Sequence, residues 1–228
     1  MTLDNKNHFK TKSFYKAPLS KRKALKIVES SYLAAATSLI WIALYYLPIG
    51  GAFFRLALPL PLALLLIRRG VKTGVEGVTV SVMLLIALMG PLRGPLVLFP
   101  YGLLSVWLGY SWQRGWNWWL SWSVGVAIGT IGFLVRVVVL SILVGENLWV
   151  IITRAGAALI EKGIDIFNLP FTPDMTQVQI VALCLVITQE IVYVLCLHAL
   201  AYWIFPRLKS SMPEPPALIE NLISLKSD

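Results

Sequence analysis

Charged side chains are scarce in this sequence. Only 14% of its 228 residues are Asp, Glu, Lys or Arg, whereas 57% are hydrophobic. A soluble domain has about 25% charged and about 45–50% apolar residues. This imbalance excludes an ordinary soluble domain and favours lipid as the solvent of the chain.

The sequence also lacks the motifs of motors and of common enzymes. It has no G-x-x-x-x-G-K-[ST] loop, no H-E-x-x-H, no C-x-x-C and no G-x-S-x-G. Its only histidines are His8 and His198, and its only cysteines, Cys184 and Cys196, lie on one predicted helix. Their spacing corresponds to about 18 Å along that helix, too far for a disulfide. We therefore expect no enzyme activity, no metal site and no cofactor.

Long apolar runs fill most of the chain. Six runs approach the roughly 20 residues that a membrane helix needs, and Gly, Pro or Arg-Gly breaks separate the first five. The pattern predicts an all-α polytopic membrane protein with a bundle of about six transmembrane helices. A basic tail (1–29) would precede the transmembrane domain (30–205), and a second tail (206–228) would follow. The predicted spans are 30–49, 52–68, 74–90, 95–112, 118–143 and 177–205.

The one long connection, residues 145–176, contains a further periodic segment. Its apolar residues recur at helical spacing, with charged residues between them, which predicts an amphipathic helix on the outer face. A partly re-entrant seventh span is the alternative. The apolar positions are Leu148, Ile151, Ile152, Ala155, Leu159 and Ile164.

The positive charges predict the orientation. Eight of the 20 Lys and Arg residues lie between Met1 and Lys26. With six spans and both termini in the cytoplasm, 15 of the 20 fall in cytoplasmic segments, as the positive-inside rule requires. We interpret the basic tail as an orientation signal beside anionic lipid, not as a nucleic-acid binding segment. The five remaining residues are Arg55, Arg93, Arg136, Arg154 and Lys162.

Ionisable residues at membrane depth are the candidates for function. Arg55, Arg93 and Arg136 come from three elements and all fall near the predicted outer level. They form either a basic mouth for an anionic group, since guanidinium suits carboxylate and phosphate, or three separate arginines that reach the headgroups. Glu190 lies near the middle of the last span. It either contributes to the site or hydrogen-bonds neighbouring helices together.

Two prolines follow Arg55 within its span. A helical proline has no N–H to give to the carbonyl four residues earlier, so Pro59 should free the Arg55 carbonyl. Such a kink is tolerated where it faces a bundle interior or a watered cavity. We expect Pro59 and Pro61 to open a cavity beside Arg55, a purely structural kink being the alternative.

Small residues form a stripe on the first span. Ser30, Ala34 and Ser38 recur every four residues, a pattern that lets helices approach closely. The stripe predicts either packing within the bundle or docking of another membrane subunit.

Two stretches, "PLPLALLLIRRG" and "YGLLSVWLGY", give the chain a family likeness. Together with the basic tail, the small-residue first helix and "LPIGGAFFRLALPLPLALLLIRRG", they resemble the YybS-like membrane proteins, commonly grouped with the S components of energy-coupling factor (ECF) transporters. The resemblance implies outward capture of a vitamin or metal ion. It also implies docking through the first helix, here Ala34 and Ser38, onto a transmembrane coupling subunit driven by two ATPases.

Two functions follow as expectations. The first is a substrate-binding subunit of an ECF-type uptake transporter for a small solute, the arginines suggesting an anionic one. The alternative is a membrane scaffold or assembly factor without a small-molecule site. A bacterial plasma membrane is the expected location, with a thylakoid or other energised membrane left open. Expected partners are the bilayer, the coupling and ATPase subunits and the solute, and not nucleic acid.

Overall fold

The chain folds into helices. The computed structural model describes residues 20–167, 174–210, 212–213 and 216, and every regular element in that part of the chain is helical. This confirms the all-α class. Turns η1 (Gly94–Val97) and η3 (Pro206–Leu208) are 3-10 and η2 (Leu98–Gly102) is π-helical. The α-helices are α1 (Lys21–Tyr46), α2 (Gly51–Ala57), α3 (Leu60–Arg69), α4 (Val71–Met89), α5 (Leu103–Gln113), α6 (Trp118–Val144), α7 (Leu148–Phe167) and α8 (Met175–Ile204).

Five helices in the described part of the chain are long and apolar enough to cross a membrane. They are α1, the pair α2–α3, α4, α6 and α8. The chain is therefore an integral membrane protein with about five spans. Helix α1 begins at Lys21, well before the predicted span, because lysine and arginine favour a helix as much as the apolar residues after them. The predicted break at 168–173 and most of both tails lie outside the described residues.

The predicted span 95–112 is not one continuous helix. It consists of η1, η2 and the short helix α5, and the backbone at Phe99 is extended, with φ −110° and ψ 120°. Phe99 precedes Pro100, and a residue before proline is pushed out of the helical region. The apolar run predicted a membrane segment here, and Pro100 interrupts the helix of that segment.

The second span is interrupted where its prolines predict. Helix α2 ends at Ala57 and α3 begins at Leu60, although Leu58 and Pro59 between them keep right-handed helical angles. The interruption is thus a loss of hydrogen bonding and not a turn of the chain. Helices α2 and α3 remain one membrane segment, with Arg55 next to the interruption.

Several helix ends with positive charge meet on one side of the molecule. Glu29 of α1 pairs with Arg68, at 2.9 Å, and with Arg69, both at the end of α3. Arg68 also donates to the Ser210 hydroxyl and to the Leu208 carbonyl, both beyond α8. The start of α1 and the ends of α3 and α8 therefore share one level. Which side of the membrane this is remains a prediction.

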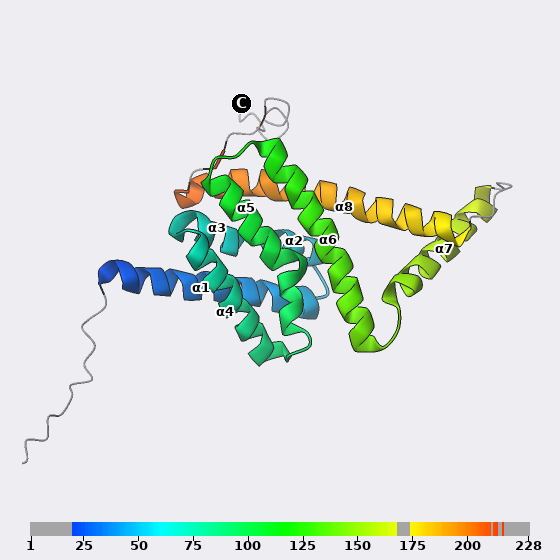
Figure 1. Cartoon of the computed structure of the whole chain (residues 1–228), viewed down its shortest axis with the longest axis horizontal. Helices are drawn as coiled ribbons and strands as arrows, with labels where there is room; N and C mark the ends of the chain where they lie inside the picture. The colour runs from blue at the N-terminus through cyan, green and yellow to red at the C-terminus, as the bar shows by residue number, and fades with distance from the viewer. Residues whose placement is uncertain (1–19, 168–173, 211, 214–215, 217–228) are drawn as a thin grey trace, which may run out of the picture.

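Helices α6, α7 and α8 form an open triangle. Helices α6 and α8 cross near the tryptophan-rich start of α6 and then diverge, and α7 joins their far ends (Figure 1). The predicted amphipathic helix is present as α7, which is not among the five candidate spans of the described chain. The diverging half of α8 is mostly exposed, so in a membrane its surface meets lipid.

Candidate functional site

The structure joins two of the predicted site residues. Arg55 on α2 and Glu190 on α8 form an ion pair, with 3.2 Å between Nη2 and Oε1. Glu190 is completely buried, whereas the Arg55 side chain is 31% exposed. A buried carboxylate is tolerated at membrane depth only when it is paired or hydrogen-bonded. The pair accounts for the presence of both charges in apolar helices.

Equal depth explains why the two residues meet. Helices α2–α3 and α8 run in the same direction and end at one level, where Arg68 bonds to Ser210. Arg55 precedes the last residue of α3, Arg69, by the same interval as Glu190 precedes the last residue of α8, Ile204. Each is therefore about 21 Å from that level along its helix. Across a hydrocarbon core of about 30 Å, the pair lies in the far half of the membrane.

Tyr193 supplies the hydrogen-bond donor that the Arg55 carbonyl lacks because of Pro59. Its hydroxyl donates to the Arg55 carbonyl at 2.9 Å, the carbonyl that loses its backbone donor because proline has no N–H. The guanidinium of the same Arg55 lies 5.2 Å from the centre of the Tyr193 ring, within the range of a cation–π contact. The predicted free carbonyl is thus present, and α8 supplies its partner.

A cavity opens beside this pair. It measures about 600 Å³ and lies between α2 and α8. Gln189 lies against Arg55, and with its amide oxygen turned toward the guanidinium it accepts from Nη2 at 2.7 Å and from Nη1 at 2.9 Å. The cavity is lined by Ala52, Arg55, Leu56, Leu185, Thr188, Gln189, Val192, Tyr193 and Cys196.

Helix α6 covers the other side of Glu190. A Cβ on Gly125 would lie 2.9 Å from Val194, and one on Gly129 would overlap the Glu190 carboxyl. The two glycines, one helical turn apart, let α6 approach α8 closely. Among the described residues, Oε2 of Glu190 has no hydrogen-bond partner. The glycine spacing in "VGVAIGT" is the signal that identifies this contact, and our sequence interpretation missed it.

Arg136 is linked to Arg55 through aromatic rings. It donates to the Tyr45 hydroxyl at 2.9 Å and lies 5.4 Å from the centre of the Trp41 ring. Ring centres then follow at 5.6 Å from Trp41 to Tyr101 and 6.4 Å from Tyr101 to Tyr193, whose ring contacts Arg55. These aromatic residues, which our sequence interpretation did not include, separate the two arginines.

Arg93 lies apart from this group. It is exposed in the turn before η1, and no side-chain hydrogen bond or ion pair joins it to the described residues around Arg55. Of the three arginines predicted at one level, the structure relates Arg55 and Arg136 to each other and leaves Arg93 outside. A role for Arg93 at a rim stays a prediction.

The small-residue stripe of α1 packs inside the chain. Ala34 and Ser38 are fully buried, and Ser81 of α4 donates to the Ala34 carbonyl at 3.1 Å while Ser38 donates to the Ser81 carbonyl at 3.3 Å. Helix α4 thus occupies this part of the face. Ser30 is partly exposed and donates to the Lys26 carbonyl, so the stripe is accessible only at this end.

A second polar group lies around His198. Its Nε2 is 3.0 Å from the Ser121 hydroxyl, and its Nδ1 is 2.9 Å from the Val194 carbonyl. The ring is completely buried between Trp112 and Trp118. Neither the cavity beside Arg55 nor the cavity at the loop before α6 is lined by His198. Its contacts tie α5, α6 and α8 together.

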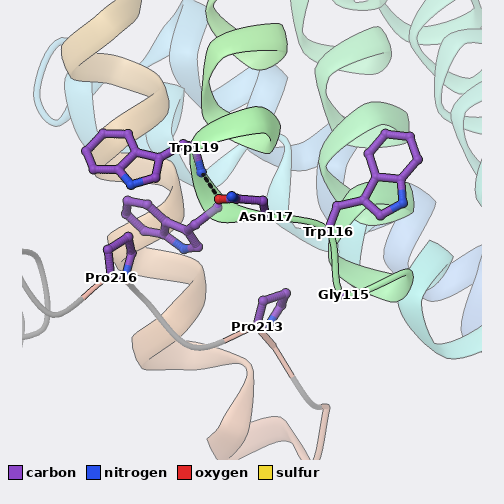
Figure 2. Close-up of a pocket in the computed structure, with 7 residues that line it drawn as sticks. Gly115, Trp116, Asn117, Trp119, Pro213 and Pro216 are labelled. Carbon is purple, nitrogen blue, oxygen red and sulfur yellow. Dashed lines mark hydrogen bonds between the residues drawn. The ribbon is translucent and has the colours of Figure 1, made fainter.

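A cavity of about 580 Å³ lies at the loop before α6. Figure 2 shows Trp116 and Trp119 on either side of Asn117, whose side chain accepts from the Trp119 N–H at 3.0 Å, with Pro213 and Pro216 facing the loop. None of the described residues that line this cavity is ionisable. The cavity beside Arg55 is therefore the stronger candidate. No group of three or more His, Cys, Asp and Glu in the described chain is placed to hold a metal ion.

The comparisons with known proteins agree with the membrane fold. A family model described as "Predicted membrane protein (DUF2232)" matches residues 35–168. This range begins in α1, includes Arg55, Arg93 and Arg136, and stops before the helix that carries Glu190. No curated protein and no solved structure matches the chain. Because the family model covers more than half of the sequence, the chain belongs to the DUF2232 family.

Proposed function

We propose that this DUF2232 membrane protein is a substrate-binding subunit of an uptake transporter, like the S components of ECF transporters, and that it binds a small solute with an anionic group. The observation that carries the proposal is the Arg55 guanidinium. Glu190 and Tyr193 hold it in place, and it is partly exposed on the wall of a cavity of about 600 Å³.

Arg55 keeps donors for a ligand. A guanidinium carries five N–H donors in a planar fork; Glu190 accepts from Nη2 and Nε is buried, so the donors left for a solute are those at Nη1 and Nη2 that the turned Gln189 amide contacts. Glu190 is buried behind it, so a solute in the cavity meets the arginine first. Carboxylate and phosphate groups suit this fork best.

The local charge favours an anion. Arg55 and Arg136 are linked by rings, and Glu190 balances one of them, which leaves one net positive charge in a region of apolar helices and aromatic rings. Electrostatic attraction is stronger where the surroundings are less polar. A solute with one negative charge would neutralise the group.

The scaffold function is the second candidate, and the ion pair between two helices favours it. Arg55 and Glu190 join α2 to α8 whether or not a solute binds, as polar contacts commonly do between membrane helices. Such a protein would copurify with other subunits and carry no small molecule.

Purification from the native membrane tests the proposal. The wild type, an Arg55→Gln/Glu190→Gln variant and a control variant of the exposed Arg154 on α7, Arg154→Gln, would be isolated in mild detergent, and copurifying subunits and small molecules identified by mass spectrometry. We expect a bound anionic solute, a transmembrane coupling subunit and ATPase subunits with the wild type and the control, and no solute with the double variant. A wild type with subunits but no solute, or a double variant with the solute still bound, would contradict the proposal.

A further inference from the structure

The outer wall of the cavity beside Arg55 belongs to the exposed surface of α8. Leu185 is 64% exposed and Val192 is 53% exposed, and both line the cavity. Helix α8 is a membrane span, so a residue exposed on this part of its surface faces acyl chains. The cavity is open sideways toward the bilayer.

We propose that the ligand of this cavity is a long-chain amphiphile with a single anionic head group, which enters from the bilayer and places its head group on Arg55 and its chain along α8. The head-group contact rests on the proposed function, whereas the lateral entry rests on the exposed wall alone.

The cavity follows one face of α8. Leu185, Gln189, Val192 and Cys196 lie at positions i, i+4, i+7 and i+11, the spacing of a single helix face. This face is about 16 Å long at 1.5 Å per residue, close to half of a hydrocarbon core of about 30 Å. From Gln189, beside Arg55, to Cys196 the groove is about 10 Å long, so it holds the first part of one acyl chain.

The polar side chains that line the groove lie together at the height of Arg55. Thr188 and Gln189 lie beside Arg55, and the apolar wall then continues through Val192 and Cys196 toward the level where α3 and α8 end. An amphiphile with its head at Arg55 would therefore point its chain toward that level. This is the direction in which a lipid of the far leaflet points.

Partition into the bilayer, and not burial in the groove, contributes the hydrophobic part of the ligand's apparent affinity. Lipid already surrounds α8, so moving a chain from the bilayer into the groove removes no further apolar area from water. Each methylene removed from water favours partition into the bilayer, so a long chain concentrates the ligand in the membrane, and Arg55 then selects the head group. A short-chain anion has no such advantage.

Photolabelling in lipid nanodiscs tests this inference. The probe is a palmitate analogue with a photoactivatable diazirine in its chain, with palmitate and butyrate as competitors and adducts mapped by mass spectrometry. We expect adducts within residues 185–196 that palmitate displaces and butyrate does not. Val192→Trp, which fills the groove from an exposed position, should lower this labelling. Ile180→Trp, at a matched exposed position of α8 outside the cavity, should not.

The head-group contact has its own variant. Arg55→Gln/Glu190→Gln removes both charges and leaves no unpaired carboxylate, so it should fold, as size-exclusion chromatography would verify. It should lower the displaceable labelling by about tenfold or more, the factor expected for one lost charge-assisted hydrogen bond.

The outcomes separate the two proposals. Labelling spread over α6 and α8 that palmitate does not displace would overturn the lipid site. Displacement by butyrate as effective as by palmitate would also overturn it, and would leave a small anionic solute as the ligand. Specific labelling together with the absence of transporter subunits in the purification would retain the lipid site and contradict the transport function.

Discussion

The ion pair between Arg55 and Glu190 predicts an unequal response to the loss of either partner. Arg55→Gln leaves a completely buried carboxylate with no cation beside it, whereas Glu190→Gln leaves a guanidinium that is still 31% exposed and that Gln189 contacts. We therefore expect the arginine variant to lose more stability than the glutamate variant.

The distance sets the scale of this loss. Two unit charges at the observed 3.2 Å interact by about 5 kcal/mol at an effective dielectric constant of about 20. Water at the exposed part of Arg55 reduces this, so we expect Arg55→Gln to lower the free energy of unfolding by about 2–3 kcal/mol, below the usual range for a broken buried pair. Glu190→Gln should lower it by about 1 kcal/mol, and the double variant by about 1–2 kcal/mol, since it leaves no unpaired charge.

Reversible unfolding in mixed detergent micelles, with increasing sodium dodecyl sulfate, measures these free energies. The exposed Arg93→Gln variant is the control and should stay within about 0.5 kcal/mol of the wild type. The reasoning is refuted if the two single losses add to the double loss within about 0.5 kcal/mol, because additive changes mean that the residues do not interact.

Three further predictions concern α6, α7, α8 and the basic tail. Gly129→Ala should lower the free energy of unfolding by about 1–3 kcal/mol, because the added Cβ overlaps the Glu190 carboxyl, whereas Gly156→Ala, where a Cβ meets no atom within 4 Å, should be neutral or stabilising in the same unfolding assay. Tyr193→Phe should cost about 1 kcal/mol in the wild type and less in a Pro59→Ala background, where the restored N–H can bond the carbonyl; equal costs in both backgrounds would contradict the role of Tyr193. Single cysteines added to the basic tail and to α7, in a protein without its native cysteines, should react with impermeant reagents from opposite sides. Labelling of both from one side would contradict the prediction that residues 95–112 cross the membrane in addition to the five candidate spans.

The apolar runs predicted the helical membrane fold because run length and turn residues are local properties. The same is true of the interruption at Pro59, whose cause is the missing N–H of one residue. The interruption of the helix before α5 could also have been predicted, since Pro100 lies within that segment. The apolar composition of 95–112 outweighed that signal in our prediction. In each case the information lies within a few consecutive residues.

The pairing of Arg55 with Glu190 was not predicted, because depth was counted from the wrong ends of the helices. Counting from the start of α8 placed Glu190 near mid-membrane and Arg55 near the outer surface. Helix α8 has 30 residues, more than a span requires, so its first turns do not mark the membrane boundary. Counting back from the shared level at the ends of α3 and α8 places both residues at one depth.

The neighbours of the stripe on α1 and of Arg136 could not be predicted, because they come from distant parts of the sequence. Ser30, Ala34 and Ser38 predicted a close helix contact, but the identity of α4 as the neighbour depends on the packing of the whole bundle. Likewise, Trp41 and Tyr101 are far apart in sequence from Arg136. Periodicity identifies a face of a helix and does not identify what lies against it.

The length of α8 has a consequence for the membrane around the protein. Its 30 residues extend about 45 Å, whereas the 19 residues of the α2–α3 segment extend about 28 Å. Two neighbouring membrane segments of one molecule therefore differ in length. A bilayer meets such a mismatch by thickening locally, or the longer helix meets it by tilting, as the divergence of α8 from α6 allows (Figure 1). Bilayer thickness would thus act directly on the width of the triangle between α6, α7 and α8.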